Sequence, residues 1–442
     1  MHSYALLVPA GLEQVACSSL PPQRHGSSEG ARHLCIPPPV ATPPGTSLGA
    51  AGAVSPIMAT TEEGPIGDNV LASPCLAAAL ALVFHSNLET HQLASASTIS
   101  GALLKGSSST WAAALTTWAA HQGMSAQDGP AAHPVTYRVA TLRFGDHTFT
   151  SRDLDGEVGS AISKLQPAWS VSLDAPHLLF ICLLVRHRIT IGLLLPPFEP
   201  RRSDVLPLEP RLWLRAGRDR PHTRPSRAAN LVRLAALQPN ERLLDPCGGI
   251  GVLCIEAATS AAVHAISLDL DAAACAAATC NAAAAASGHA LVAGAQVCVV
   301  HGDCTRTPLQ GGSVDVVIAD LPFGLRHARL DIGALMRELA RLVPAGGRAI
   351  ILGSAGPGGS ATACAKVVRT QQPHATWLLR GETPCYSGGV PCDVLRFERL
   401  SSPTSEGSGT RRRGKRPLDP HATRPQGEQQ SHSPPSVQMA VD

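Results

Sequence analysis

The sequence predicts a two-part protein, in which an α+β region precedes a doubly wound α/β domain. From about residue 224 to residue 400, short apolar strands alternate with helical segments, which is typical of a parallel sheet covered by helices on both faces. Between about residues 69 and 195, strands come in hairpin-like pairs with a helix between the pairs. The length of 442 residues agrees with roughly three domains at about 150 residues each.

Composition and charge exclude several classes of protein. The chain has 36 Lys and Arg against 33 Asp and Glu, a formal net charge of +3, which excludes a histone-like cation and an acidic disordered chain. All but four of the basic residues are Arg, whose planar guanidinium suits phosphate better than a Lys ammonium does. Aromatic residues make up only 3%, so a surface that stacks many RNA bases on rings is not expected.

We expect no disulfide framework, no metal site and no membrane span. The 13 cysteines are odd in number and lack C-x-x-C pairs and nearby His ligands, which is typical of reduced, buried thiols. No apolar run approaches the ~18–20 residues of a membrane helix. The longest, Leu178–Val185, stops at Arg186, and the first residues lack the basic segment and cleavage pattern of a signal peptide.

Two segments differ in composition from the rest. Residues 36–68 are rich in Pro, Gly, Ala, Ser and Thr and predict a disordered insertion or linker. The tail, residues 401–442, is similar and carries the basic cluster Arg411–Pro417. This cluster is either a solvated tail without a role, or a nuclear address or loose RNA contact.

The first folded region has four expected strands and one expected helix. Thr136–Phe144 alternates as a half-buried strand does, and Gly145–Ser151 is interpreted as a turn and a second short strand. Leu178–Val185 and Ile189–Leu195 are apolar strands on either side of a basic turn. Gly156–Lys164 is the helix candidate between the pairs.

A basic stretch joins the two folded regions. Residues 201–233 hold nine Arg against three acids, a local net charge of +6. The stretch is either a solvated linker or a surface that follows phosphates between two RNA-facing domains.

The second folded region has the strand–helix alternation of a doubly wound sheet. The Ala-rich stretch Asp271–Ser287 predicts a helix with Asp271 as its N-cap and Gly288 at the C′ position. Before it, Leu243–Gly251 ends a strand and opens a helix, where Gly248, Gly249 and Gly251 allow a tight turn and a close approach to a ligand. The strict G-x-G-x-x-G spacing is absent, which disfavours a dinucleotide site.

Acids end four successive strands of this region. They are Asp245, Asp269, Asp303 and Asp320. Carboxyl ends of parallel strands line the crevice where open α/β sheets bind ligands. There, Asp269 can accept two ribose hydroxyls, and Asp303 can accept the amino group of an adenine. Each acid by itself could instead be a helix cap or turn residue.

The segment Asp320–Gly324, with the sequence DLPFG, suits a nucleobase amine. Such an amine is a poor nucleophile, so a site that alkylates it needs acceptors for its two N–H groups and a flat surface for the base. Asp320 supplies one acceptor, and the backbone carbonyl of Leu321 or Pro322 supplies the other. Phe323 supplies a stacking face, worth roughly 1–3 kcal/mol per base. The alternative is a tight turn after a buried strand.

At these residues the chain resembles the THUMP-domain class I methyltransferases that make N2-methylguanosine in tRNA. The resemblance covers roughly three quarters of the chain and departs from the family pattern at Ile250, where a threonine is common, and at Leu325, where a lysine is common. The segments that carry it are His2–Ala16, Thr110–Ala120, Val135–Asp153, His222–Leu237, Leu244–Ala258, Asp320–Gly324 and Tyr386–Arg399.

The resemblance implies a domain order as well as a Rossmann-like methyltransferase fold. The expected parts are a ferredoxin-like region (1–104) that contains the insertion, a THUMP domain (105–199), a basic linker (200–224), the class I methyltransferase domain (225–400) and the basic tail (401–442).

The resemblance also implies the ligands and their residues. The cofactor would be S-adenosylmethionine, bound by Asp245, Pro246, Gly248, Gly249, Gly251, Asp269 and Asp303. The catalytic residues would be Asp320, Leu321, Pro322 and Phe323, and RNA contacts would come from Arg215, Arg218, Arg220, Arg224 and Arg326. The partners would be tRNA and a small zinc-binding activator subunit that pairs along a sheet edge, in the cytoplasm, the nucleus or both.

Three other functions stay open from the sequence. The same chemistry could act on a small nuclear RNA. A second alternative is a non-catalytic RNA-binding protein with a decayed pocket, which the Ile250 departure favours and the four acids oppose. The third is a methyltransferase for small molecules or protein glutamine, for which the first 199 residues would be dispensable.

Overall fold

The computed structural model describes most of the chain between residues 2 and 401. The described residues are 2–9, 12, 15–16, 54–61, 73–106, 108–125, 130, 135–198, 211–322, 330–370, 376–387 and 390–401. They belong to one compact unit, residues 1–402. The expected tail beyond residue 401, and Phe323 and Arg326, lie outside the described residues.

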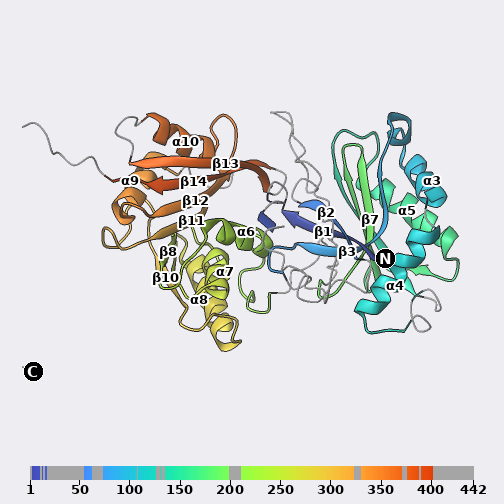
Figure 1. The fold of residues 1–442 in the computed structure, drawn as a ribbon, viewed down its shortest axis with the longest axis horizontal. Helices are drawn as coiled ribbons and strands as arrows, with labels where there is room; N and C mark the ends of the chain where they lie inside the picture. Colours follow the sequence, from blue (N-terminus) through green and yellow to red (C-terminus); the bar gives the residue numbers. More distant parts are fainter. Residues whose placement is uncertain are drawn as a thin grey trace, which may run out of the picture. The chain divides into compact units, whose positions relative to one another are not determined.

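The first region is built on a seven-stranded mixed sheet in the order β2-β1-β3-β7-β6-β4-β5 (Figure 1). Its strands are β1 (His2–Pro9), β2 (Val54–Thr61), β3 (Ala78–Asn87), β4 (Thr136–Phe144), β5 (Ser170–Val171), β6 (Leu178–Val185) and β7 (Arg188–Leu194). Its helices are η2 (Thr90–Leu93), α3 (Ala96–Gly106), α4 (Ser108–His121) and α5 (Ser151–Leu165). The α+β class of this region and its three main strands are therefore as predicted.

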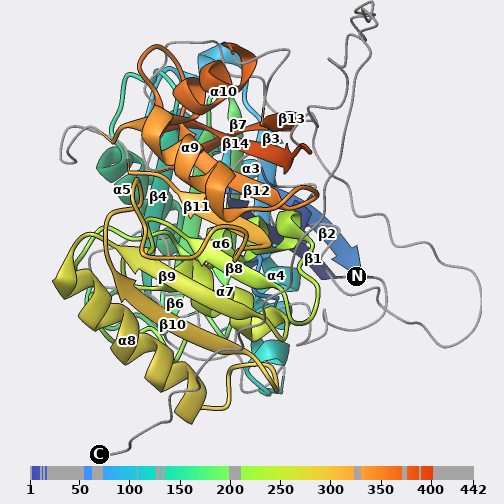
Figure 2. The ribbon, with the colours of Figure 1, turned by 90° about the vertical axis from the view of Figure 1, so that its left-hand side faces the viewer.

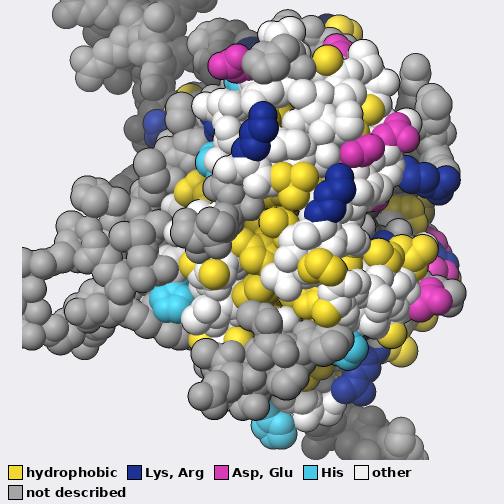
Figure 3. Space-filling view, turned by 90° about the vertical axis from the view of Figure 1, so that its right-hand side faces the viewer, with side chains coloured by type: hydrophobic (Ala, Val, Ile, Leu, Met, Phe, Trp, Pro, Cys, Tyr) yellow, Lys and Arg dark blue, Asp and Glu magenta, His cyan; other side chains and the backbone are white. Residues whose placement is uncertain are grey.

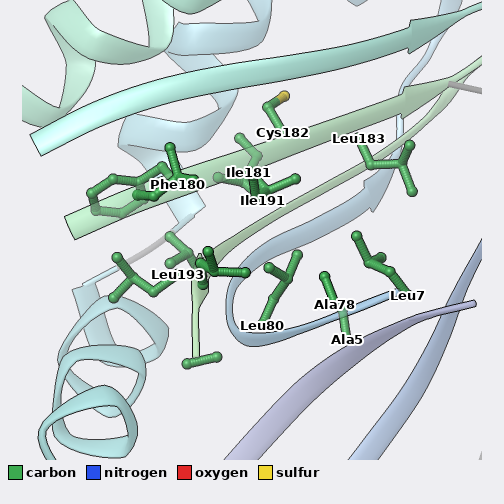
Figure 4. Close-up of a cluster of buried hydrophobic side chains, with 14 of the residues drawn as sticks. Ala5, Leu7, Ala78, Leu80, Phe180, Ile181, Cys182, Leu183, Ile191 and Leu193 are labelled. Atoms are coloured by element: carbon green, nitrogen blue, oxygen red, sulfur yellow. The ribbon is translucent and has the colours of Figure 1, made fainter. Parts of the chain in front are cut away.

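The core of this sheet follows from the unbroken apolar run of β6. Seven of its eight residues are buried, as expected of a strand that is covered on both faces of its sheet. Figure 4 shows Phe180, Ile181 and Leu183 of β6 beside Ile191 and Leu193 of β7, with residues of β3 and β1 continuing the cluster. A strand buried on both faces cannot alternate apolar with polar residues, which explains its composition.

Three predictions for this region are wrong. The second short strand in Gly145–Ser151 is absent, because Thr150 caps α5 there: its hydroxyl accepts from the Asp153 N–H, and the Asp153 carboxylate accepts from the Thr150 N–H. The helix consequently begins at Ser151 instead of Gly156. In addition, Val54–Thr61, inside the expected disordered insertion, pairs with β1 over eight residues as an edge strand.

The second region is a doubly wound sheet in the order β10-β9-β8-β11-β12-β14-β13. Its strands are β8 (Arg242–Asp245), β9 (His264–Asp269), β10 (Gln296–His301), β11 (Val316–Asp320), β12 (Arg348–Ser354), β13 (Trp377–Ser387) and β14 (Val390–Arg399). Its helices are α6 (Pro225–Ala235), α7 (Val252–Ser260), α8 (Ala272–Ser287), α9 (Ile332–Leu342) and α10 (Ser360–Thr370). The first five strands are parallel, and β14 runs antiparallel to β12 and β13.

Each face of this sheet has its own apolar core. One core contains side chains of α6 and α7 together with Ala285 of α8, and the other contains side chains of α9 and α10. The helices α7 and α8 lie against β9 and β10 (Figure 2). Helices on both faces of a parallel sheet confirm the predicted doubly wound class.

The strand order places a switch point between β8 and β11. From β8 the chain adds β9 and then β10 on one side, and it returns to add β11 on the other side of β8. Ligands of open α/β sheets bind at such a point, beyond the carboxyl ends of the strands. Asp245 ends β8 and Asp320 ends β11, so two predicted site residues flank the switch point.

The Ala-rich helix α8 has the predicted start and a slightly different end. The Asp271 carboxylate accepts from the Ala273 N–H at 2.8 Å, which confirms the predicted N-cap. Gly288 is the C-cap with φ −82°, and His289 takes the left-handed conformation with φ 55°. The prediction of Gly288 at C′ is therefore wrong by one residue. Among the described residues, no helix has the length and apolar character to cross a membrane.

Candidate active site

The glycine turn after β8 brings backbone N–H groups to the switch point. The Gly248 N–H donates to the Leu268 carbonyl and the Gly251 N–H donates to the Gly248 carbonyl, each at 2.8 Å. A Cβ at Gly248 would lie 2.1 Å from the Ser267 Oγ, so only glycine fits between the loop and β9. Gly249 and Gly251 have φ of 52° and 87°, in the left-handed region that glycine favours. The predicted tight turn is confirmed.

Gly251 also leaves the start of α7 open. It is the N-cap of α7 and has no side chain to cap the helix, so N–H groups of the first turn are available to a ligand. An added Cβ at Gly251 would lie 3.1 Å from the Cβ of Ala278, because α8 packs closely on this turn.

Asp269, at the end of β9, holds the glycine turn from the other side. Its Oδ2 accepts from the Gly249 N–H at 2.8 Å, and its Oδ1 accepts from the Asp271 N–H at 2.9 Å. A carboxylate has about four acceptor positions, so these two bonds leave capacity for two further donors. This geometry agrees with the predicted contact to a diol.

Asp245 is a buried acid at the end of β8. Its side chain is about 1% exposed, and its Oδ1 accepts from the Cys247 N–H at 3.1 Å. Burial raises the pKa of the Asp245 carboxyl well above its usual range, and the negative charges of Asp320 and Asp269 raise it further. Asp245, Asp269 and Asp320 therefore lie within electrostatic reach of one another at this edge of the sheet.

Asp320, across the switch point, has one satisfied and one unsatisfied oxygen. Its Oδ2 accepts from the Thr223 hydroxyl, whereas its Oδ1 is inaccessible to water and has no hydrogen-bond partner among the described residues. Burial raises the pKa of the Asp320 carboxyl, while the Thr223 hydrogen bond and the positive charge of Arg227 oppose that rise. An unpaired buried acceptor is costly, so Oδ1 is suited to a donor that arrives with a ligand.

The buried Asp245 carboxyl suits a cationic ligand. Its raised pKa means that ionisation is unfavourable until a positive charge is supplied. S-adenosylmethionine carries a sulfonium and an ammonium group, and the glycine turn offers the close backbone approach that its methionine part requires. The residues of the crevice therefore fit this cofactor.

The remaining predicted site residues are placed less centrally. Asp303 follows β10 on the surface, where its Oδ1 accepts from the Thr305 N–H at 2.8 Å and the Thr305 hydroxyl at 2.7 Å. The Thr305 N–H bond lowers the pKa of Asp303. Leu321 is fully buried in the core below the site, and its N–H donates to the Leu352 carbonyl at 2.9 Å. Pro322 is half-buried.

The predicted RNA-contacting arginines are partly held by their own chain. Arg215 Nε donates to the Leu212 carbonyl and Arg218 Nε donates to the Leu214 carbonyl. Arg220 forms an ion pair with Asp271, and Arg224 is the N-cap of α6. Figure 3 shows one face of the molecule, on which Lys and Arg side chains lie apart from one another while apolar side chains gather near the middle. That face has no continuous basic patch among the described residues.

Asn281 is a site residue that the sequence reasoning missed. Its side chain is fully buried inside the alanines of α8. Its Oδ1 accepts from the N–H groups of Arg215 and Ala216 at 2.9 and 2.8 Å, and its Nδ2 donates to the carbonyls of Ala216 and Ile250 at 3.1 Å each. It therefore ties the segment before α6 to the glycine turn. A single polar residue in an alanine run was the available signal.

Thr223 and Arg227 were missed as well, because their partners lie far away in the sequence. Ile250 also has a different role from the one its departure suggested. It is about 1% exposed, and a Cβ on Gly217 would lie 2.7 Å from its Cγ2. Ile250 thus packs against the segment before α6, so the departure concerns packing, and the suggestion of a decayed pocket loses its support.

The comparison with protein families identifies the second region. Residues 214–370 match the family described as "RMKL-like, methyltransferase domain". This stretch of the chain is similar to that methyltransferase family, in keeping with the resemblance found in the sequence, and its doubly wound sheet has the class I methyltransferase fold.

Curated relatives match part of the chain. The tRNA (guanine(6)-N(2))-methyltransferase THUMP3 of Bos taurus is 26% identical over 230 residues, 49% of this chain and 43% of that protein. A demethylmenaquinone methyltransferase of Mycobacterium marinum is 33% identical over 138 residues, 31% of this chain and 50% of that protein. The chain thus spans about half the length of these relatives or less.

Among solved structures, TrmN from Thermus thermophilus is similar over nearly the whole chain. The two share 21% sequence identity with a TM-score of 0.57, and the match covers 90% of this chain and 100% of the other. At this identity the likeness shows the fold, including the region before the methyltransferase domain.

Proposed function

We propose that this protein is an S-adenosylmethionine-dependent tRNA methyltransferase that forms N2-methylguanosine, in the acceptor-stem region of the tRNA. The observation that carries the proposal is the buried, unpaired Oδ1 of Asp320 at the switch point, opposite Asp245. The name of the THUMP3 relative, which acts on a tRNA guanine N2, supports the substrate class.

In the proposed reaction the chain positions an amine against an electrophilic methyl group. When bound, the cofactor would supply that methyl group on its sulfonium; the guanine N2 would take the methyl group, sulfur would keep the electron pair of its broken bond to carbon, and the proton lost from N2 would pass to solvent. Asp320 Oδ1 accepts a hydrogen bond from the amine and stabilises the positive charge that develops on nitrogen. Placement of the two atoms within about 3–3.5 Å accounts for most of the rate.

The other site residues keep their assigned roles as proposals. Asp245, Pro246 and the turn of Gly248, Gly249 and Gly251 hold the methionine part of the cofactor, Asp269 the ribose and Asp303 the adenine amine. The Leu321 or Pro322 carbonyl accepts the second N–H of the guanine, and Phe323 stacks on the base.

The tRNA is held outside the crevice. In the first region, residues 105–199 form the proposed THUMP domain. This region would recognise the shape of the tRNA and bind its phosphates together with the arginines at positions 215, 218, 220, 224 and 326. That binding offsets the few kcal/mol needed to flip a paired guanine into the pocket. We expect the enzyme to act in the cytoplasm, the nucleus or both.

A zinc-binding activator subunit is the proposed protein partner. Among the described strands, β10 is the outermost one of the catalytic sheet, and its residues are half-buried or exposed. Leu270, about 72% exposed, lies beside it: the Leu270 carbonyl is 3.0 Å from the His301 Nε2. An unpaired edge with a nearby exposed aliphatic side chain is suited to strand addition by a partner.

The test is methyl transfer from labelled S-adenosylmethionine to unmodified tRNA transcripts, with and without the activator, followed by nucleoside analysis. We expect labelled N2-methylguanosine. Label on a small nuclear RNA alone would overturn the substrate class, label on a small molecule alone would favour the chemistry of the demethylmenaquinone relative, and no transfer to any of them would overturn the enzymatic proposal.

A further inference from the structure

We infer that Thr223 is a positioning residue that orients the Asp320 carboxylate, with Arg227 supplying the compensating charge, so that Oδ1 alone faces the substrate amine. The inference rests on the proposed function, which it deepens by adding two residues that act through Asp320.

The hydrogen bond between Thr223 and Asp320 gives the two carboxylate oxygens different roles. The Thr223 hydroxyl has one proton, and it donates that proton to Oδ2. Oδ1 is left buried, with no hydrogen-bond partner in the part of the chain that the structure describes. A carboxylate that could rotate would exchange the two oxygens, whereas one held at Oδ2 presents the same oxygen to each incoming amine.

The local backbone holds Thr223 in place. Arg224 has φ −61° and ψ 138°, the extended conformation imposed on a residue before proline, and Pro225 starts α6. Eight residues before Thr223, the N–H groups of Arg215 and Ala216 are bound by Asn281. The hydroxyl is therefore presented from a segment that is held at both ends.

Arg227, one turn into α6, is a buried cation without a carboxylate partner among the described residues. Its Nη1 donates to the Ser387 hydroxyl at 2.9 Å, its Nη2 donates to the Tyr386 carbonyl at 2.7 Å, and its Nε has no partner. A buried cation needs compensating negative charge. Asp320 lies within its electrostatic reach, so the two charges stabilise one another.

The charged and titratable groups around Asp320 set the sign of its pH dependence. Asp245 of β8 is a second carboxyl group, whose own pKa is raised, and Arg227 of α6 is positive. Cys385 and Cys392, opposite each other on β13 and β14, are held as neutral thiols by burial, which raises their pKa. Thr223 and Arg227 both lower the pKa of Asp320. Removal of the Thr223 hydroxyl therefore raises it, and the ionised form is lost at a higher pH.

The experiment compares Thr223→Val, which keeps the shape and removes the donor, with Thr223→Ser, which keeps the donor. Thr279→Val on α8 is the matched control, because the Thr279 hydroxyl donates to the Cys275 carbonyl of its own helix. We expect Thr223→Val to lower kcat by roughly 10- to 100-fold, with little change in KM for tRNA, and to move the acid limb of the kcat profile to higher pH. Thr223→Ser and Thr279→Val should keep the wild-type profile. A Thr223→Val profile that matches that of Thr279→Val overturns the inference.

A second measurement does not depend on activity. In a double-mutant cycle on urea unfolding of the full chain, Thr223→Val should lower the midpoint in the wild-type background and leave it unchanged in an Asp320→Leu background, because the acceptor is then gone. Equal effects in both backgrounds contradict the inference even in an active enzyme. Failure of the wild-type protein to methylate any RNA counts against the proposed function alone.

Discussion

At the scale of single residues, the acids of the site reduce the stability of the fold. Burial raises the pKa of Asp245 and Asp320, so the native state binds more protons than the unfolded state between a carboxyl pKa of about 4 and the raised native values. Stability consequently falls as the pH rises through that window. Asp303, whose pKa is lowered by Thr305, has the opposite sign: its contribution is present at neutral pH and is lost in acid.

We expect Asp320→Asn to abolish methyl transfer while it increases stability. The amide has the shape of the carboxylate but carries no charge, so the variant should gain about 0.5–2 kcal/mol in unfolding free energy near pH 7, with a smaller gain at pH 4. Urea unfolding at both pH values and a transfer assay measure the two effects. Asp303→Asn is the control and should gain nothing. A loss of cofactor binding in Asp320→Asn would contradict the assigned role.

Gly248 offers a steric test of the cofactor turn. An alanine Cβ there would lie 2.1 Å from Ser267 Oγ and 3.1 Å from its Cβ, so Gly248→Ala should displace the turn, cost about 1–3 kcal/mol and weaken S-adenosylmethionine binding. Ser267→Gly removes both of these atoms, and the double variant should therefore recover part of the affinity. Calorimetric titration of the four proteins measures this. Equal affinities for the single Gly248→Ala variant and the wild type would show that the turn does not approach the ligand closely.

At the scale of elements, the polar contacts that α8 makes to the glycine turn and to the segment before α6 come from one side chain, Asn281. Most of this helix is alanine, and Asn281 forms the hydrogen bonds described above to the segment before α6 and to the glycine turn. A helix of small residues can lie close to the turn, and the amide supplies the polar contacts that alanine lacks.

We expect Asn281→Ala to lower the unfolding free energy by about 2–4 kcal/mol, because it removes the partner of part-buried backbone groups of residues 215 and 216 and of the buried carbonyl of residue 250. Hydrogen exchange should increase at the N–H groups of Arg215 and Ala216. Cys280→Ala, an exposed neighbour on the same helix, is the control and should change stability by less than about 0.5 kcal/mol. Unchanged exchange at residues 215 and 216 would show that the segment is held by other contacts.

At the scale of the whole molecule, the first region and the methyltransferase domain share buried contacts. Leu12 lies in the apolar core of α6 and α7, and the Asn230 Nδ2 of α6 donates to the Cys75 carbonyl at 3.1 Å. Deletion of residues 1–199 would expose these groups. Loss of activity in that fragment would therefore not distinguish a need for RNA binding from a loss of stability.

A matched pair of leucines tests this coupling. Leu12 is about 1% exposed and Leu212 about 86% exposed. We expect Leu12→Ala to cost about 2–4 kcal/mol of unfolding free energy in the full chain, whereas Leu212→Ala should stay within about 0.5 kcal/mol of the wild type. Thermal unfolding with and without cofactor measures both. A neutral Leu12→Ala would mean that the methyltransferase core does not depend on the first region.

The features that the sequence alone predicted are local ones. The strand–helix alternation, the glycine turn, the N-cap at Asp271 and the acids at strand ends all lie within short windows of sequence. Hydrophobic period, backbone conformation and capping act over a few residues, so such windows contain the whole signal. Prediction from short windows was wrong at Thr150, which caps a helix where a strand was expected. It was also wrong at Val54–Thr61, which forms a strand by pairing with β1, a segment distant in the sequence.

Only the tertiary structure could identify the residues that act through contacts far away in sequence. Hydrogen bonds join Thr223 to Asp320, 97 residues away in the sequence, and Asn281 to Ala216, 65 residues away. Another joins Arg227 to Ser387, 160 residues away. Threonine, asparagine and arginine are common, and nothing in their neighbours along the chain marks these three. Their function comes from where the doubly wound topology brings the ends of β8 and β11 together, because a hydrogen bond depends on distance in space.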